Sequence, residues 1–186
     1  MRDGKLTSKA TLLCKIELGL AGFVEHQLPV PIPEGDKKRW LYVTPEIDAL
    51  LSGNGPPEAG FPSVFAREVI NRFCRGWVWS VTSKRNKKIT ADLKKMEDHD
   101  EAWVFIFPKP RPGWRLFGRF YGTDVFVGLL CKDRHDCEPD EVYQQHAADM
   151  IALWEAKLPA EPVRGKFFEA YLSDPIGTII RNKDEP

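Results

Sequence analysis

The segment from Trp103 to Trp154 constrains the fold more than any other part of this chain. Apolar residues alternate there in short runs separated by turn residues, which predicts three strands between residues 103 and 134. A helical apolar spacing follows and predicts one long helix over residues 139–158. We therefore expect an α+β fold, with an antiparallel or mixed sheet centred on residues 103–134 and helices packed on one face.

The last two predicted strands form a hairpin whose turn sets the register. Gly122 followed by Thr123 suits a two-residue turn, because glycine takes a positive φ without steric cost. That turn places Arg119 opposite Phe126 and sorts the strands into two faces. One face is almost purely apolar and carries Leu116, Phe120, Val125, Val127, Leu129 and Cys131. The other mixes cations with aromatic rings and carries Arg115, Phe117, Arg119, Tyr121, Phe126, Lys132 and Arg134.

The two faces predict different surroundings. Burial of the apolar face contributes about 1.5–3 kcal/mol for each large side chain, so this face is predicted to pack on the core. Cations interleaved with rings are typical of a surface that binds the phosphates and stacks the bases of a nucleic acid. They are equally typical of a half-covered sheet on which arginine stems lie over aromatic rings. The sequence leaves both interpretations of the second face open.

The whole chain, 1–186, is predicted to form a single α+β domain. Its parts are an N-terminal strand and linker (11–39), a body (40–157) and an apolar C-terminal segment that docks on the body (159–186). Within the first two parts the patterns further predict strands at 11–20, 40–43 and 77–81, and helices at 45–52, 63–75 and 84–96.

The charged residues are distributed unevenly, although the formal net charge is zero. Residues 72–95 hold eight Lys and Arg against one Asp, and residues 109–119 hold four against no acidic residue. A basic middle between acidic flanks favours a localised anion-binding surface, although such runs are usually only solvated faces. The densest run supplies four candidate nucleic-acid-binding residues, Lys84, Arg85, Lys87 and Lys88.

Motifs of the common nucleotide, zinc-protease and serine-hydrolase chemistries do not occur in the sequence. Four cysteines in 186 residues do not suggest a disulfide scaffold. The spacing of Cys131, His135, Cys137 and His146 matches no ordinary structural zinc site, so we expect neither a metal nor an organic cofactor. The apolar runs suit neither a signal peptide nor a membrane span, and we expect a cytoplasmic protein without a membrane partner.

The run CKDRHD (131–136) places cations and a histidine at the end of the last predicted strand. Cleavage of RNA through its 2′-hydroxyl needs a base, an acid and cations that stabilise the charge developing on the phosphate. Groups of these kinds are supplied by Arg115, Arg119, Lys132, Arg134 and His135. The same run is also typical of an ordinary charged loop before a helix.

This arrangement resembles the RelE/ParE toxin superfamily, in particular its phage-derived, RelE-like branch. The resemblance lies within residues 40–157, in a helix-rich half followed by the strand WVFIF, the hairpin RLFGRFYGTDVFVGLL, the basic loop CKDRH and a closing helix. It implies that Arg115 and Arg119 match the strand arginines of the family, and that Lys132 and Arg134 match its basic groups after the last strand. RelE-like members cleave messenger RNA on the ribosome, ParE-like members act on gyrase, and both are held silent by an antitoxin.

The leading hypothesis is therefore a RelE-like toxin, a metal-independent endoribonuclease whose partners are RNA or the ribosome and an antitoxin protein. The five residues that supply base, acid and cations are its expected catalytic residues. Its expected nucleic-acid-binding residues are Lys84, Arg85, Lys87, Lys88, Phe117 and Tyr121.

One alternative is a non-catalytic module that binds RNA or DNA through the basic segments. Another is a protein-interaction or structural component that docks through the apolar residues 163–180. The sequence predicts no oligomeric state.

Overall fold

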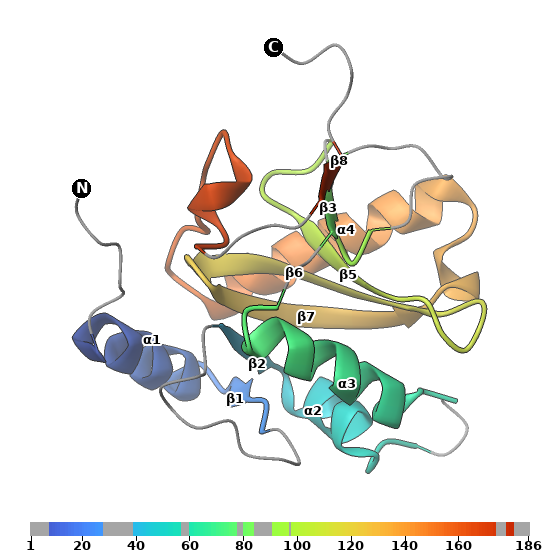
Figure 1. Cartoon of the computed structure of the whole chain (residues 1–186), viewed down its shortest axis with the longest axis horizontal. Helices are drawn as coiled ribbons and strands as arrows, with labels where there is room; N and C mark the ends of the chain where they lie inside the picture. Colours follow the sequence, from blue (N-terminus) through green and yellow to red (C-terminus); the bar gives the residue numbers. More distant parts are fainter. Residues whose placement is uncertain are drawn as a thin grey trace.

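The computed structural model of the chain describes residues 8–27, 39–56, 60–77, 80–83, 91–96, 98–173 and 178–180. These residues form a mixed sheet of eight strands in the order β1-β2-β7-β6-β5-β4-β3-β8, with helices on both sides (Figure 1). The strands are β1 (Val24–Glu25), β2 (Trp40–Val43), β3 (Ser80–Thr82), β4 (Leu93–Lys95), β5 (Trp103–Phe107), β6 (Trp114–Gly122), β7 (Val125–Asp133) and β8 (Thr178–Ile180). The helices are α1 (Ser8–Leu20), α2 (Pro45–Ser52), α3 (Ser63–Cys74) and α4 (Asp140–Lys157), with short 3-10 turns η3 (His135–Cys137) and η4 (Phe168–Ala170).

The predicted α+β class is confirmed, and the predicted centre of the sheet is present. Strands β5, β6 and β7 are antiparallel neighbours, while β2 runs parallel to β7 and β3 runs parallel to both β4 and β8. The strand predicted at 40–43 and the helices predicted near 45–52, 63–75 and 139–158 are also present. None of the described helices is both long and apolar enough to span a bilayer.

Two apolar cores lie on opposite faces of the sheet. The core on one face takes its helical residues from α2 and α3, including Leu51, Ile70 and Phe73. The core on the other face takes them from α4 and α1, including Met150 and Leu18. The sequence analysis placed helices on one face, whereas the structure has them on both, because α4 lies behind the sheet and α2 and α3 lie in front of it (Figure 1).

The register of the β6–β7 hairpin differs from the predicted one. The turn consists of Thr123 and Asp124, and Gly122 pairs with Val125. Asp124 adopts a φ of 64°, and its carboxylate accepts the Ser173 N–H at 3.0 Å. This bond comes from a residue 49 positions away. The turn is therefore fixed partly by a contact that local sequence does not show.

The shifted register divides the predicted apolar face between the two cores. Arg119 lies opposite Val127 instead of Phe126, and the ladder shifts between Phe117 and Gly118 and again between Phe120 and Gly122. Leu116, Phe120 and Phe126 belong to one core, whereas Phe117, Val125, Val127 and Leu129 belong to the other. The prediction gathered the apolar residues on one face of the hairpin and the cations and aromatic rings on the other. Both faces are covered, so apolar residues are needed on each.

Two predicted elements are corrected in type. Residues 11–20, predicted as a strand, lie in the helix α1, because the apolar residues Leu12, Ile16 and Leu20 recur at a spacing of four that a helix also satisfies. The helix predicted at 84–96 is wrong at its C-terminal end, where Leu93–Lys95 forms β4 between β3 and β5. Residues 84–90 of that prediction lie outside the described residues.

The C-terminal segment packs on the sheet over its described residues. The Val163 N–H donates to the Phe120 carbonyl oxygen at 2.8 Å, and the Asp124 N–H donates to the Tyr171 carbonyl oxygen at 2.8 Å. Tyr171 and Leu172 are buried in the same core as α2 and α3. The apolar residues that suggested a partner-docking tail are therefore used, at least in this stretch, by the protein itself.

Gly118 tests the observed register, because a methyl group there would lie 2.1 Å from the Val127 carbonyl oxygen and 2.6 Å from the Phe126 ring. We predict that Gly118→Ala lowers the free energy of unfolding by about 1–3 kcal/mol, since the backbone cannot move away. Gly122→Ala is the matched control in the same strand, where the nearest atoms would be 3.8 Å away. Urea unfolding of both variants measures the difference. Equal stabilities would contradict this close approach of β6 and β7.

Candidate functional site: a cationic cluster at the end of the central hairpin

Arg115, Lys132 and Arg134, three of the five predicted catalytic residues, gather at one end of the β6–β7 hairpin. Arg115 and Lys132 are directly opposed across the two strands. Arg134 follows the end of β7, and its N–H donates to the Gly113 carbonyl oxygen at 2.9 Å, which holds it beside the start of β6. We call Arg115, Lys132 and Arg134 the cationic cluster.

The charge of Arg115 is not neutralised by an ion pair within the described residues. Its Nη1 donates to the carbonyl oxygen of Trp114 at 2.9 Å, and burial lowers the pKa of the guanidinium from its ordinary value. An arginine nevertheless keeps its proton under all physiological conditions. A half-buried cation without a carboxylate partner attracts an anion more strongly than a fully hydrated one does.

The other two cations differ in how far they are paired. Arg134 Nη2 lies 2.9 Å from Glu138 Oε1, and its Nη1 is buried without a hydrogen-bond partner among the described residues. Lys132 has no ion pair in the part of the chain that the structure describes. The cluster therefore contains donors that have no partner among the described residues.

Tyr143 of α4 lies beside the cluster and was not among the candidate site residues of the sequence analysis, which predicted only the helix of residues 139–158 that contains it. Its ring is 5.2 Å from the Phe117 ring and 5.8 Å from Lys94 Nζ, measured between or to ring centroids. Burial raises the pKa of Tyr143 to about 12, against a smaller opposing effect of Arg115. The hydroxyl therefore stays protonated at neutral pH and is a hydrogen-bond donor. In the sequence, this position was indicated only by the hydroxyl group of Tyr143 among the apolar residues of the predicted helix.

Two histidines lie near this end of the hairpin in different surroundings. His135, a predicted catalytic residue, opens η3 with an exposed side chain, and its backbone N–H donates to Asp133 Oδ1 at 2.7 Å. His146 lies one turn after Tyr143, and its Nε2 donates to the Asp136 carbonyl oxygen at 2.9 Å. The opposite nitrogen of His146 is buried and has no partner among the described residues. His135 is thus the histidine that a ligand from solvent reaches directly.

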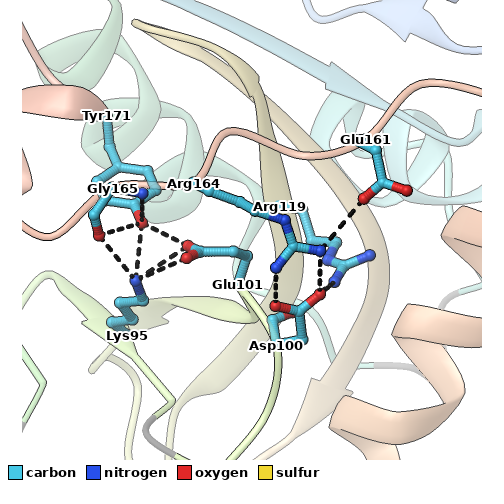
Figure 2. Close-up of polar contacts among 8 residues, drawn as sticks. All are labelled: Lys95, Asp100, Glu101, Arg119, Glu161, Arg164, Gly165 and Tyr171. Atoms are coloured by element: carbon cyan, nitrogen blue, oxygen red, sulfur yellow. Dashed lines mark hydrogen bonds and ion pairs between the residues drawn. The ribbon is translucent and has the colours of Figure 1, made fainter.

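Arg119 lies apart from the cationic cluster, in an ion pair beneath α4. It is 2% exposed, its Nη2 is 3.0 Å from Asp100 Oδ2, and its guanidinium lies 5.6 Å from the centre of the Trp154 ring. Arg164 of the C-terminal segment donates to both oxygens of the same carboxylate and also pairs with Glu161 (Figure 2). The sequence analysis left open whether the face that carries Arg119 binds a ligand or is covered, and in the structure α4 covers it there.

A second network beside Arg119 ties the C-terminal segment to the turn before β5. Lys95 Nζ lies 3.0 Å from Glu101 Oε2 and 2.7 Å from the hydroxyl oxygen of Tyr171 (Figure 2). The Tyr171 hydroxyl donates to Glu101 at 2.5 Å. Glu101 has a φ of 49°, which is rare for a residue with a side chain. Because these groups saturate one another, the network is a structural tie.

The predicted nucleic-acid-binding residues are distributed among different surroundings. Phe117 is fully buried beneath Tyr143 and is closed to a stacking base. The Tyr121 hydroxyl donates to Glu17 of α1, and its ring lies 6.1 Å from that of Trp154. The other four, Lys84, Arg85, Lys87 and Lys88, lie outside the described residues.

No group of three or more potential metal ligands occurs among the described residues. Burial raises the pKa of the Cys131 thiol to about 12 and that of Cys137 to about 11. Metal binding by cysteine requires the thiolate, which these environments disfavour. The groups of the cationic cluster suit the electrostatic stabilisation of an anion, with a protonated tyrosine and an exposed histidine nearby.

Comparison of the chain with models of protein families, with curated proteins and with solved structures finds no match.

Substitution of Asp100 tests the stabilising ion pair of Arg119, because Asp100 supplies the carboxylate that compensates this buried cation. We predict that Asp100→Ala lowers the free energy of unfolding by about 1.5–3 kcal/mol, the range for hydrogen bonds to charged groups. Glu161→Gln is the control, since Glu161 pairs among the described residues only with the exposed Arg164, and it should change stability by less than about 1 kcal/mol. Urea unfolding of both variants at pH 7 gives the comparison. Equal effects would contradict a stabilising role for the Asp100–Arg119 pair.

The same ion pair predicts a pH dependence of stability. Hydrogen bonds from Arg164, with the positive charges of Arg164 and Arg119, hold the pKa of Asp100 below its ordinary value. A lowered folded-state pKa stabilises the folded protein at pH values above the unfolded pKa, near 4 for aspartate, and this contribution is lost as the pH falls further. The free energies of unfolding of the native protein and of Asp100→Ala, measured between about pH 3 and pH 7, should therefore converge at the acid end of this range.

Proposed function

We propose that the protein is an RNA-directed, metal-independent endoribonuclease of the RelE-like kind, which acts in the cytoplasm through the cationic cluster. The observation that carries this proposal is the pairing of Arg115 with Lys132 at the hairpin end, where neither side chain has an ion-pair partner among the described residues. Two adjacent cations fixed on neighbouring strands suit a phosphate that gains negative charge during cleavage.

The surrounding residues suit the remaining requirements of the reaction. The protonated Tyr143 hydroxyl is a donor for a non-bridging phosphate oxygen. His135 follows the cluster directly in the chain, is exposed and is the residue type that most often exchanges protons near neutral pH. In this proposal Arg115 and Lys132 stabilise charge and Arg134 positions the phosphate, while His135 accepts the proton of the 2′-hydroxyl and then donates it to the leaving 5′-oxygen. Arg119 has no part in the reaction.

The order of elements from β2 to α4 supports the proposal. Residues 40–157 contain a strand, two helices, the short strands β3 and β4, the β5–β6–β7 strands, the basic CKDRH loop and a closing helix. The RelE-like resemblance rests on the helices, the strand WVFIF, the hairpin, the basic loop and the closing helix of this order. The ribosome as the place of action and an antitoxin as the silencing partner follow from the same resemblance and belong to the proposal.

A non-catalytic nucleic-acid-binding protein is the second candidate, and the β5–β6 loop favours it. Lys109 and Arg111 are exposed in this loop and have no ion pair among the described residues. Because the loop joins the same end of β6 that carries Arg115, it extends the cationic surface. Phosphate contacts alone need no proton transfer, so this candidate predicts binding without cleavage.

RNA cleavage by the native protein and by Arg115→Ala distinguishes the proposed enzyme from a protein with another function. We predict that the purified protein cleaves single-stranded RNA in the presence of EDTA and that Arg115→Ala lowers the cleavage rate by a factor of roughly 10²–10³, as expected when one group that stabilises transition-state charge is removed. Lys157→Ala, at the far end of α4, is the matched control and should leave the rate unchanged. In cells, expression should arrest growth and Arg115→Ala should relieve the arrest. RNA that stays intact, with no growth arrest, would exclude the enzyme.

Salt dependence separates the second candidate from a protein that does not bind nucleic acid. If Lys109, Arg111, Arg115 and Lys132 each contact one phosphate, the logarithm of the RNA association constant should fall with the logarithm of salt concentration at a slope of about −2.8. Arg111→Ala should reduce the slope by about 0.7 and weaken binding to all sequences alike. Fluorescence anisotropy with a labelled single-stranded RNA measures both. A slope near zero would contradict phosphate binding at this surface.

A further inference from the structure

Within the described residues, helix α1 packs into the core through one side of the helix. Leu18 is fully buried and lies in the same core as Phe23 and α4. Glu17 accepts a hydrogen bond from Tyr121 at the edge of this contact. Figure 1 shows α1 at the side of the molecule, next to β1 and away from α2 and α3.

The opposite side of α1 is an exposed apolar stripe. Leu12 is 56% exposed, Leu13 50%, Ile16 50% and Leu20 85%. Three of them recur every fourth residue, so they form one ridge along the helix. Single exposed apolar residues are normal on a protein surface, but a continuous ridge of them marks a contact surface. We call these four residues the α1 stripe.

The charges beside the stripe indicate what covers it. Successive residues of a helix are about 100° apart, so Lys15 and Glu17 lie on opposite flanks of Ile16. When two identical helices pack side by side in the same direction, a two-fold axis between them brings opposite flanks together. Lys15 of each copy then lies opposite Glu17 of the other copy, which gives two equivalent ion pairs. In an antiparallel pair the same flanks meet, which places like charges together.

We propose that the α1 stripe is a self-association surface, through which two copies of this chain pair with their α1 helices parallel around a two-fold axis at Ile16. The stripe of each copy covers that of the other, and the Lys15–Glu17 pairs set the direction. A helix of 13 residues is about 20 Å long, so the contact lies at the small end of specific interfaces, and we expect a dissociation constant in the micromolar range.

Sedimentation equilibrium of the full chain, in reducing buffer, tests this proposal between roughly 1 and 100 μM, a range that spans the expected dissociation constant. We expect a monomer–dimer equilibrium for the native protein and at least tenfold weaker association for Ile16→Glu. Val64→Glu is the matched control, because Val64 is 74% exposed on α3, outside the stripe. A monomer at the highest concentration, or a dimer that Ile16→Glu leaves intact, would overturn the proposal.

A charge exchange tests the direction of pairing. Lys15→Glu and Glu17→Lys should each weaken association, since each places like charges across the axis, and the double variant should restore it. Within one copy, the Lys15–Glu25 ion pair and the Tyr121–Glu17 hydrogen bond are disturbed in the double variant as well. Restoration therefore reports contacts between copies. A double variant as weak as the single ones would overturn the parallel arrangement.

Discussion

Cover on both faces of the sheet is the constraint on which the rest of this structure depends. The nine-residue strands β6 and β7 lie between the α2–α3 core and the α4 core, so a charged residue in the middle of either strand has no route to water. Such a residue must be compensated by a partner, as Arg119 is by Asp100. Arg115 is placed differently, because it lies one residue from the strand end. The covered faces thus give Arg119 a stabilising ion pair, whereas Arg115 has no ion pair among the described residues.

The sequence predicted the elements of the central sheet well, because each has a strong local signal. The apolar run WVFIF, the helix start at Pro45 and the apolar stripe of α4 are patterns of a few neighbouring residues. The hairpin register failed for a physical reason. It was chosen to separate apolar from polar residues, and that criterion loses its power when both faces are buried. Helix α1 was mistaken for a strand because Leu and Ile at even positions satisfy both periods over ten residues.

The candidate site was predictable only in part. Arg115, Lys132 and Arg134 were expected together because position at a strand end depends on local order, and a shift of one or two residues does not separate them. Tyr143 was not expected at the site, since its place depends on how α4 crosses the sheet. The ion pair of Arg119 was equally hidden, because Asp100 lies in a turn 19 residues earlier and Arg164 lies 64 residues beyond that aspartate.

The C-terminal segment decides which surfaces remain for partners. Its Tyr171 and Leu172 complete the core beside Trp103, and its Arg164 shares Asp100 with Arg119. A segment that fills its own core and compensates a buried charge cannot leave the body without exposing both, at a cost of several kcal/mol. Release of residues 163–173 to bind another protein is therefore disfavoured. Among the described surfaces, the half-buried cationic cluster and the exposed α1 stripe reach solvent without such a cost, and they lie on different elements. Nucleic-acid binding at one and self-association at the other are consequently compatible in a single molecule.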